Sequence, residues 1–390
     1  MADAAAAVDA AALIDASDPV DAAASIDAAE ASDASNGVET QALGLNDISM
    51  ILPTTLEGLY GKMNGVDAAR DLVPRDLYAR LVTSHGDVVA QFDDFLIFAI
   101  RFDLCNRVDL GPCPEGADGS LRIVFQPVLP QAIAADAGLH AFYTIPAADL
   151  KYVVNELRAI ARLTGSDELR AGPLLEQHIH YFAGIPRLKA LLDKYALADH
   201  LIQLTMMGQD ARSATPRVVF RGVERRGGEM VDMKVATLDV TEQAAALSDT
   251  DPSYTVTPVA DTPAGFALAM SSGSFNAATP AGQRAAVDAL VAAENPLLHT
   301  ASTVQCVACH VSTYLDEHRA AIAGIDVASL PSRFPTSHDV TVLSGVSTTN
   351  ERSLHAFSWM GSSVSISRRV ANETAVVLDE IERRFPVPGR

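Results

Sequence analysis

The chain has 390 residues and a formal net charge of −20, from 49 acidic and 29 basic residues. Nucleic acids and anionic membrane surfaces attract clustered Lys and Arg, so this balance argues against both as partners. Hydrophobic residues make up 48% of the chain, as in a globular protein, and no apolar run reaches the roughly 18 residues of a membrane-spanning helix.

Residues 1–42 have the composition of a disordered tail. Residues 1–61 contain eleven Asp and Glu and no Lys or Arg, so over half of the net charge lies there. Aspartates recur every six residues from Asp3 to Asp33 in an Ala and Ser background. This spacing spreads the charges around a helix and leaves no apolar stripe to bury, so we expect a flexible, solvated segment.

Residues 43–274 carry mixed patterns and are predicted to form an α+β domain. Strands are predicted at 94–104 and 120–129, and later in PRVVFRGV and EMVDMKVATLDV. Two helices are predicted between these pairs of strands, in AADLKYVVNELRAIARL and in PRLKALLDKYALADHLIQLTM, with Pro186 at the start of the second. The region has no glycine-rich phosphate-binding motif and no nucleophile elbow, so it indicates no particular chemistry.

Two of the four cysteines lie in this region. Cys105 and Cys113 are eight residues apart and flank the turn between the first two predicted strands, a geometry that a local disulfide fits. A pair of reduced structural thiols is the alternative. Disulfides persist in oxidising compartments, so a bridge here would indicate an exported protein.

Residues 275–390 change to helices and loops and are predicted to form a separate domain. A helix is predicted over 280–294, with Thr279 as its capping residue. VSTYLDEHRAAIAG reads as a second helix that ends at Gly324, and SRRVANETAVVLDEIERRF as a last helix over 367–385.

The sequence CVACH, residues 306–310, lies between the first two of these helices. In this C-x-x-C-H pattern two thiols can each add to one vinyl group of haem, and the adjacent histidine can ligate the iron. One alternative is a zinc site, in which His318 or His299 would complete the two cysteines. The other is a bare redox dithiol, although the surrounding sequence has no thioredoxin-like βαβ unit.

Residues 279–385 resemble a single-haem c-type cytochrome domain. The shared features are the order of a helix, the C-x-x-C-H motif, a methionine and a C-terminal helix. The resemblance implies a mostly α-helical, cytochrome c-like C-terminal domain with one covalently bound haem c. It further implies that Cys306 and Cys309 are the thioether anchors and that His310 is the proximal iron ligand.

The second axial ligand has more than one candidate. The resemblance implies Met360, whereas His299, shortly before the motif, is a rival and His355 a weaker one. A thioether ligand would raise the redox potential relative to a second histidine. Arg368 and Arg369, near the start of the last helix, are candidates for ion pairs with the haem propionates, and a solvated helix start is the alternative.

The chain as a whole also resembles uncharacterised bacterial secreted or lipoprotein-type proteins with one c-haem motif. A c-type haem and a disulfide both imply a periplasmic, outer-membrane-associated or secreted protein. The sequence begins without the basic and apolar regions of a signal peptide. We therefore expect translation to start upstream of Met1 and to supply a signal peptide, with or without a lipid anchor.

Two functions from different classes follow from these expectations. The first is extracytoplasmic electron transfer through one haem, with a redox partner protein or a small electron donor or acceptor as partner. The second is a haem-dependent oxidoreductase enzyme whose iron keeps an open distal site. A zinc-stabilised binding protein is the lesser alternative.

Overall fold

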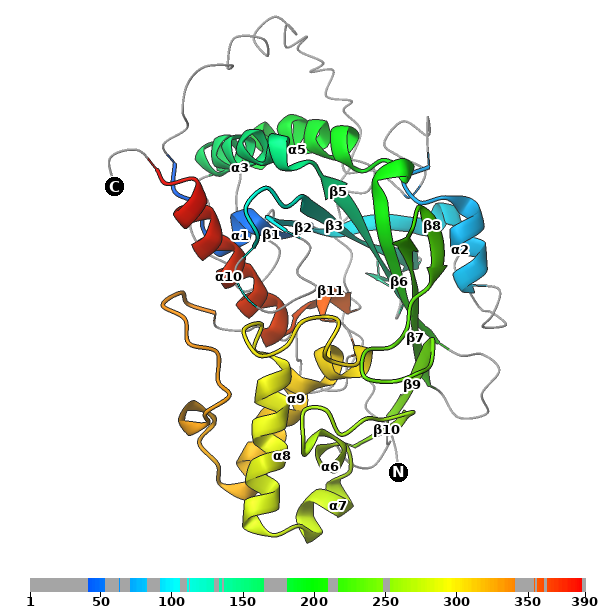
Figure 1. Ribbon diagram of the computed structural model, residues 1–390, viewed down its shortest axis with the longest axis vertical. Coiled ribbons are helices and arrows are strands. Elements are labelled where there is room, and N and C mark those ends of the chain that lie inside the picture. The colour runs from blue at the N-terminus through cyan, green and yellow to red at the C-terminus, as the bar shows by residue number, and fades with distance from the viewer. Residues whose placement is uncertain are drawn as a thin grey trace, which may run out of the picture. The chain divides into compact units, whose positions relative to one another are not determined.

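The centre of the structure, a computed structural model, is a large antiparallel β-sheet with helices packed on it (Figure 1). The residues that it describes are 41–52, 63, 71–82, 92–105, 111, 113–129, 133–134, 137–164, 181–209, 217–247, 253–340, 354, 356–360 and 363–387. All of them belong to one compact unit, residues 39–390.

Ten strands of the described chain form the sheet. They are β1 (Ser49–Ile51), β2 (Phe95–Asp103), β3 (Gly119–Leu129), β4 (Ile133–Ala134), β5 (Gly138–Ile145), β6 (Leu201–Gln209), β7 (Val218–Arg226), β8 (Glu229–Asp232), β9 (Glu242–Leu247) and β10 (Tyr254–Thr257). Their order across the sheet is β1-β2-β3-β5-β6-β7-β9-β10, with β4 beside β3 and β8 beside β7. Each of these pairings is antiparallel.

The helices and a small hairpin surround this sheet. The helices are α1 (Leu45–Ile48), α2 (Arg75–Val82), α3 (Leu150–Thr164), α5 (Tyr181–Tyr195), α6 (Phe266–Ala269), α7 (Ser272–Ala277), α8 (Pro280–Ala293), α9 (Cys306–Ala323) and α10 (Arg368–Arg384). The hairpin consists of β11 (Phe357–Met360) and β12 (Ser363–Ile366). None of the helices in the described part of the chain is long and apolar enough to cross a membrane.

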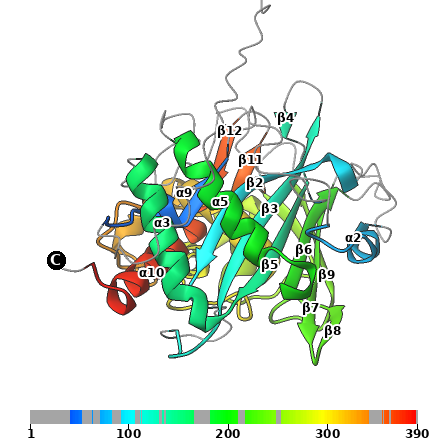
Figure 2. The same ribbon diagram turned by 90° about the horizontal axis from the view of Figure 1, so that it is seen from above.

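The side chains of β3 point alternately to the two faces of the sheet. Leu121, Ile123 and Phe125 are buried in a cluster with the apolar residues of α3 and α5, which we call the first core. Figure 2 shows these two helices side by side over the sheet. Since successive side chains of a strand point to opposite faces, Arg122 and Gln126 lie on the other face.

That other face is covered in part by the β11–β12 hairpin. Trp359 packs against residues of β2 and β3, and its indole Nε1 donates to the Leu52 carbonyl oxygen at 2.7 Å. The amide of Gln126 bonds to the Trp359 backbone in both directions, at 2.9 and 3.0 Å. These bonds satisfy polar groups that the hairpin would otherwise bury without a partner.

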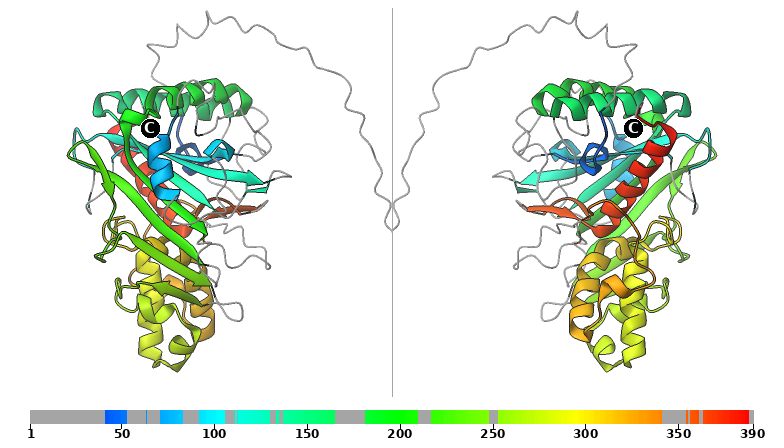
Figure 3. Two further views of the ribbon diagram at one scale, coloured as in Figure 1. Left: turned by 90° about the vertical axis from the view of Figure 1, so that its right-hand side faces the viewer. Right: turned by 90° about the vertical axis from the view of Figure 1, so that its left-hand side faces the viewer.

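A second core lies at the β9–β10 end of the sheet, where α8 and α9 pack side by side (Figure 3). Arg319 of α9 is fully buried there. Its guanidinium donates to the Ala269 carbonyl oxygen at 2.9 Å and to Ser272 Oγ at 2.8 Å, and it stacks over the Phe275 ring. Helix α9 is therefore held in place by directed bonds as well as by apolar contact.

The expected fold class, an α+β region followed by a mostly helical cytochrome c-like domain, is wrong. Most strands belong to one antiparallel sheet, and the last quarter of the chain contains the β11–β12 hairpin. Helix α10 turns its apolar residues Ala375, Leu378 and Ile381 into the first core. The physical reason is that an apolar helix face shows that a helix is buried but not which partner buries it.

Several local predictions fare differently from the fold class. The helix at 280–294 is confirmed, and the hydroxyl of Thr279 accepts from the Gly282 amide at 3.2 Å as its cap. The end of α9 at Gly324, with a φ of 64°, is also confirmed. The long helix predicted from Pro186 is wrong at both ends, because it begins at Tyr181 and gives way to strand β6.

Two predictions stay open. The disordered tail, residues 1–42, lies outside the described residues except for its last two positions. The division of the remaining chain at residue 274 also stays a prediction.

Candidate functional site

The C-x-x-C-H motif forms the first turns of α9. Cys306 begins the helix, so Cys309 and His310 follow it at the three- and four-residue spacings that share one helix face. The capping residue Gln305 makes no side-chain bond to the first turn. Instead Gln243 of β9 accepts from the Val307 amide at 3.0 Å, so the sheet itself holds the start of the motif helix.

All three motif side chains line one cavity between α9 and the sheet. The cavity measures about 150 Å³ and is partly open to solvent. Its sheet wall comes from four neighbouring strands in register, with Arg122 opposite Phe142, Phe142 opposite Gln203, and His140 opposite Thr205. This is the face of the sheet that α3 and α5 leave uncovered.

The imidazole of His310 is oriented by the backbone. Its Nδ1 contacts the carbonyl oxygen of Leu354, and a carbonyl only accepts hydrogen bonds, so Nδ1 carries the proton. The lone pair is then on Nε2, the atom that a metal would take. The ring also packs against Phe220 of β7, with ring centroids 4.7 Å apart.

Burial keeps both motif thiols protonated. It raises the pKa of Cys306 to about 12, with Cys309 adding to the effect. Burial also raises the pKa of Cys309, although the nearby Arg369 and Arg122 oppose the rise. A reactive redox dithiol needs the opposite, a lowered pKa, so these surroundings do not favour the bare dithiol alternative.

The axial-ligand candidates from the sequence lie in different places. Met360 is in β11, where its backbone pairs with Ser363, and its side chain is outside the described part. His355 is also outside the described residues. His299 is half-buried beside Thr303, with Nδ1 3.4 Å from Oγ1, and it is not among the described residues that line the cavity.

The structure brings three other candidate ligands to the cavity, which the sequence reasoning missed. They are His140 of β5, Met207 of β6, and Met233, which follows β8 and whose sulfur accepts from the Gln203 amide at 3.2 Å. Each lies more than 70 residues before the motif, so only the fold places it there. For His140 and Met207, the one signal that could have pointed to them was the alternation of their strands, which puts every second side chain on the cavity face.

The two arginines proposed for propionates have different surroundings. Arg368 is bound by acidic side chains, with Glu294 at 2.9 Å, Glu317 at 2.8 Å and Asp316 in closer contact. Arg369 lines the motif cavity. Its guanidinium also donates to the backbone carbonyl oxygens of Ala293 and His299, at 3.2 and 2.9 Å.

The zinc alternative gains no support from the described side chains. No group of three or more His, Cys, Asp or Glu among them is arranged to hold a metal ion. His318, a suggested zinc ligand, stacks on the ring of Tyr314 with centroids 6.1 Å apart.

The remaining cysteines form a disulfide. Cys105 and Cys113 are bonded, with their Cα atoms 5.7 Å apart. The bridge joins the end of β2 to the segment that leads into β3, and Cys105 lines a second cavity beside the first.

In comparisons with protein-family models, curated proteins and solved structures, nothing matches this chain.

Proposed function

We propose that the chain is an extracytoplasmic c-type haem protein that transfers electrons through one haem attached to Cys306 and Cys309. One observation carries the proposal: both thiols and the His310 ring line the same cavity from one face of α9. The disulfide between Cys105 and Cys113 fits the same oxidising compartment, periplasmic, outer-membrane-associated or secreted.

Whether haem fits the motif cavity can be tested on the donor atoms and on the size of the cavity. Two thiols and a histidine are the groups by which a c-type haem is held. Pockets for organic ligands measure about 300–1,000 Å³, so a haem held in this cavity of about 150 Å³ would extend out through its open side. The donor set, two thiols and a histidine, fits the group.

Each motif residue has a separate task in this proposal. Cys306 and Cys309 supply the sulfur atoms of the thioether bonds, which fix the group to the first turn of α9. His310 presents Nε2 to the iron, while its Nδ1–H bond to the Leu354 carbonyl fixes the ring and raises its basicity. When bound, haem supplies one-electron redox chemistry.

The sheet wall offers candidates for a second iron ligand, which bears on the choice between electron transfer and catalysis. His140 and Met207 stand on that wall, and each has the soft or imidazole donor that ligates haem iron. A second protein ligand favours electron transfer with a redox partner protein or a small donor or acceptor. An open distal position would favour the alternative, a haem-dependent oxidoreductase enzyme.

The test is to export the chain with a signal peptide in a host that attaches c-type haem. We expect haem peroxidase staining of the wild-type band on a denaturing gel and none for Cys306→Ser/Cys309→Ser. The matched control is Cys105→Ser/Cys113→Ser, which loses the same number of thiols and keeps the motif, so its band should stain. A wild-type chain that carries stoichiometric zinc and no covalent haem contradicts the proposal.

A second measurement addresses the axial ligand. In the oxidised visible spectrum, a sulfur–iron charge-transfer band that disappears in Met207→Leu would identify Met207. A bis-histidine spectrum that changes in His140→Gln would identify His140. A high-spin spectrum unaffected by both substitutions would place the protein with the haem enzymes instead.

A further inference from the structure

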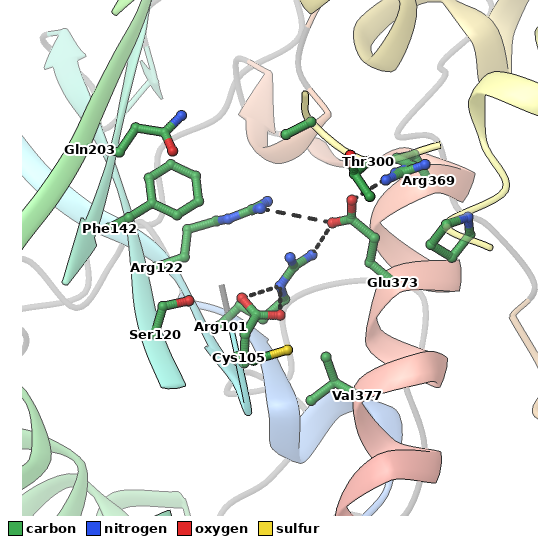
Figure 4. Close-up of a pocket in the computed structure, with 13 residues that line it drawn as sticks. Arg101, Cys105, Ser120, Arg122, Phe142, Gln203, Thr300, Arg369, Glu373 and Val377 are labelled. Atoms are coloured by element: carbon green, nitrogen blue, oxygen red, sulfur yellow. Dashed lines mark hydrogen bonds and ion pairs between the residues drawn. The ribbon is translucent and has the colours of Figure 1, made fainter. Parts of the chain in front are cut away.

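The second cavity, next to the motif cavity, is lined by charged side chains (Figure 4). It measures about 80 Å³ and lies between β2, β3 and the first turns of α10. Arg122, Arg369 and Glu373 line both cavities, so the two cavities are adjacent.

The charges in this second cavity do not balance. The described residues that line it include three guanidinium groups and two carboxylates, so one positive charge is left over. Arg101 binds Asp103 at 3.0 Å and also contacts Glu373. Arg369 binds the second oxygen of Glu373 at 2.7 Å. Both carboxylates are therefore already engaged by two of the three arginines.

Arg122 is the arginine whose charge remains. Its nearest carboxylate oxygen, on Glu373, is 3.8 Å from Nη2, which is beyond a hydrogen bond. Its Nε is buried and has no hydrogen-bond partner among the described residues. The guanidinium lies over the Phe142 ring at 4.6 Å, with its side chain 15% exposed. Burial, with Arg101 adding to it, lowers the pKa of Arg122 to about 10, as expected of an under-compensated cation.

We propose that the second cavity binds a carboxylate group on the guanidinium of Arg122. A carboxylate carries one negative charge, which matches the one positive charge left over. Its two oxygens also match the fork of an arginine. The cavity of about 80 Å³ has room for a group of that size and not for a large anion.

This carboxylate can come from two sources. One is a small organic acid free in solution, which needs no haem and would place a substrate or effector next to the motif cavity. The other is a propionate of a haem in the adjoining cavity, and that source alone rests on the proposed function. The chemistry at Arg122 is the same in both.

The first arm of the test uses protein that cannot attach haem, the Cys306→Ser/Cys309→Ser variant. Acetate and succinate are titrated calorimetrically at constant ionic strength, with chloride as the compensating anion. We expect saturable binding that Arg122→Gln weakens by about tenfold or more. Arg226→Gln, a change on the exposed β7–β8 hairpin, is the matched control and should leave the affinity unchanged.

A variant that merely unfolds would mislead, so the circular dichroism spectrum and melting temperature of Arg122→Gln are compared with the parent. Arg122→Lys is the second variant, which keeps the charge, loses the fork and should bind with intermediate affinity. Absence of saturable binding in the parent, or equal affinities for the parent and a folded Arg122→Gln, overturns the inference.

The second arm repeats the titration with the haem-loaded protein. Binding to both forms identifies a free acid as the ligand. Binding to the haem-free form alone shows that a propionate fills the cavity once haem is attached. If the wild-type chain attaches no haem at all, the proposed function fails, while the result of the first arm still decides whether Arg122 binds a carboxylate.

Discussion

Two neighbouring residues of α10, Arg368 and Arg369, belong to charge clusters of opposite balance. The cation-rich cluster consists of Arg101, Arg122, Arg369, Asp103 and Glu373. The acid-rich cluster consists of Glu294, Asp316, Glu317 and Arg368. In the cation-rich cluster one positive charge is poorly compensated, and in the acid-rich cluster one negative charge is poorly compensated.

The poorly compensated charges respond in opposite ways. In the acid-rich cluster Asp316 is fully buried, and its Oδ1 has no hydrogen-bond partner among the described residues. Burial, with Glu294 adding to it, raises the pKa of Asp316 well above its usual range. A carboxyl group can relieve the imbalance by keeping its proton, whereas an arginine cannot lose its proton near neutral pH and needs an anion instead. The difference between the clusters therefore indicates a proton site on one side and a ligand site on the other.

The largest expected effect comes from breaking the cation-rich cluster at Glu373. The three arginines hold the pKa of Glu373 well below its usual range, although burial alone would raise it. Glu373→Gln would leave buried guanidinium groups uncompensated, and we expect a loss of about 3–5 kcal/mol in the free energy of unfolding in urea. Asp379→Asn, an exposed change on the same helix, is the control, and we expect it to cost under about 1 kcal/mol. Equal losses in the two variants would mean that the cluster is not the source.

A smaller effect is expected from Asp316→Asn. A raised pKa means that the folded chain holds a proton that the unfolded chain releases, so this group's contribution falls as pH rises from its ordinary value of 3.8 through its folded value. Glu373 acts in the opposite sense, because its contribution is lost as pH falls below 4.5 through its folded value.

We therefore expect Asp316→Asn to flatten the decline of stability with rising pH and to gain about 1 kcal/mol at pH 7. Urea unfolding at a series of pH values measures both. Asp379→Asn, the exposed change on α10 outside this cluster, serves as the control here too. An unchanged slope in Asp316→Asn would show that this carboxyl does not hold the proton.

The smallest effect is expected from Arg122→Gln. Because Arg122 carries the charge that the cluster does not compensate, removing it should change the free energy of unfolding by no more than about 1 kcal/mol, towards greater stability. Arg101→Gln changes the same residue type in the same cluster, but Arg101 binds both carboxylates, so a loss of about 3 kcal/mol is expected. Urea unfolding without added carboxylate measures both variants. Similar losses in the free energy of unfolding would show that the cluster does not distinguish these two arginines.

The sequence predicts those features that depend on a few consecutive residues, such as helix ends and short motifs. Thr279 and Gly324 limit their helices through local backbone chemistry, and the C-x-x-C-H spacing contains its own chemical meaning. The same holds for the cysteine pair across one turn. In each case the interacting groups are close along the chain, so no knowledge of the fold is needed.

The rest depends on pairings that no local pattern contains. Leu201–Gln209 continues an apolar run after a helix, so its periodicity did not distinguish strand from helix. With β6 missed, the pairing of His140 with Thr205 is also missed, and with it the sheet wall of the cavity. Arg122 and Glu373 are themselves separated by most of the chain. Only the packing of α10 on the sheet brings them together.

The glutamine pair at the start of α9 has a consequence for how accurately the motif faces the sheet. Gln243 and Gln305 are fully buried and joined at 2.6 Å, and the other end of each amide is bound to backbone, at Val307 and Ala260. An amide turned end for end would set donor against donor at Val307 or acceptor against acceptor at Ala260, so only one orientation of each amide satisfies these contacts. A slip of β9 by one residue would replace Gln243 with an acidic or a methyl side chain. The orientation of the cysteines and of His310 towards the sheet therefore depends on the register of β9, a single strand near the edge of the sheet.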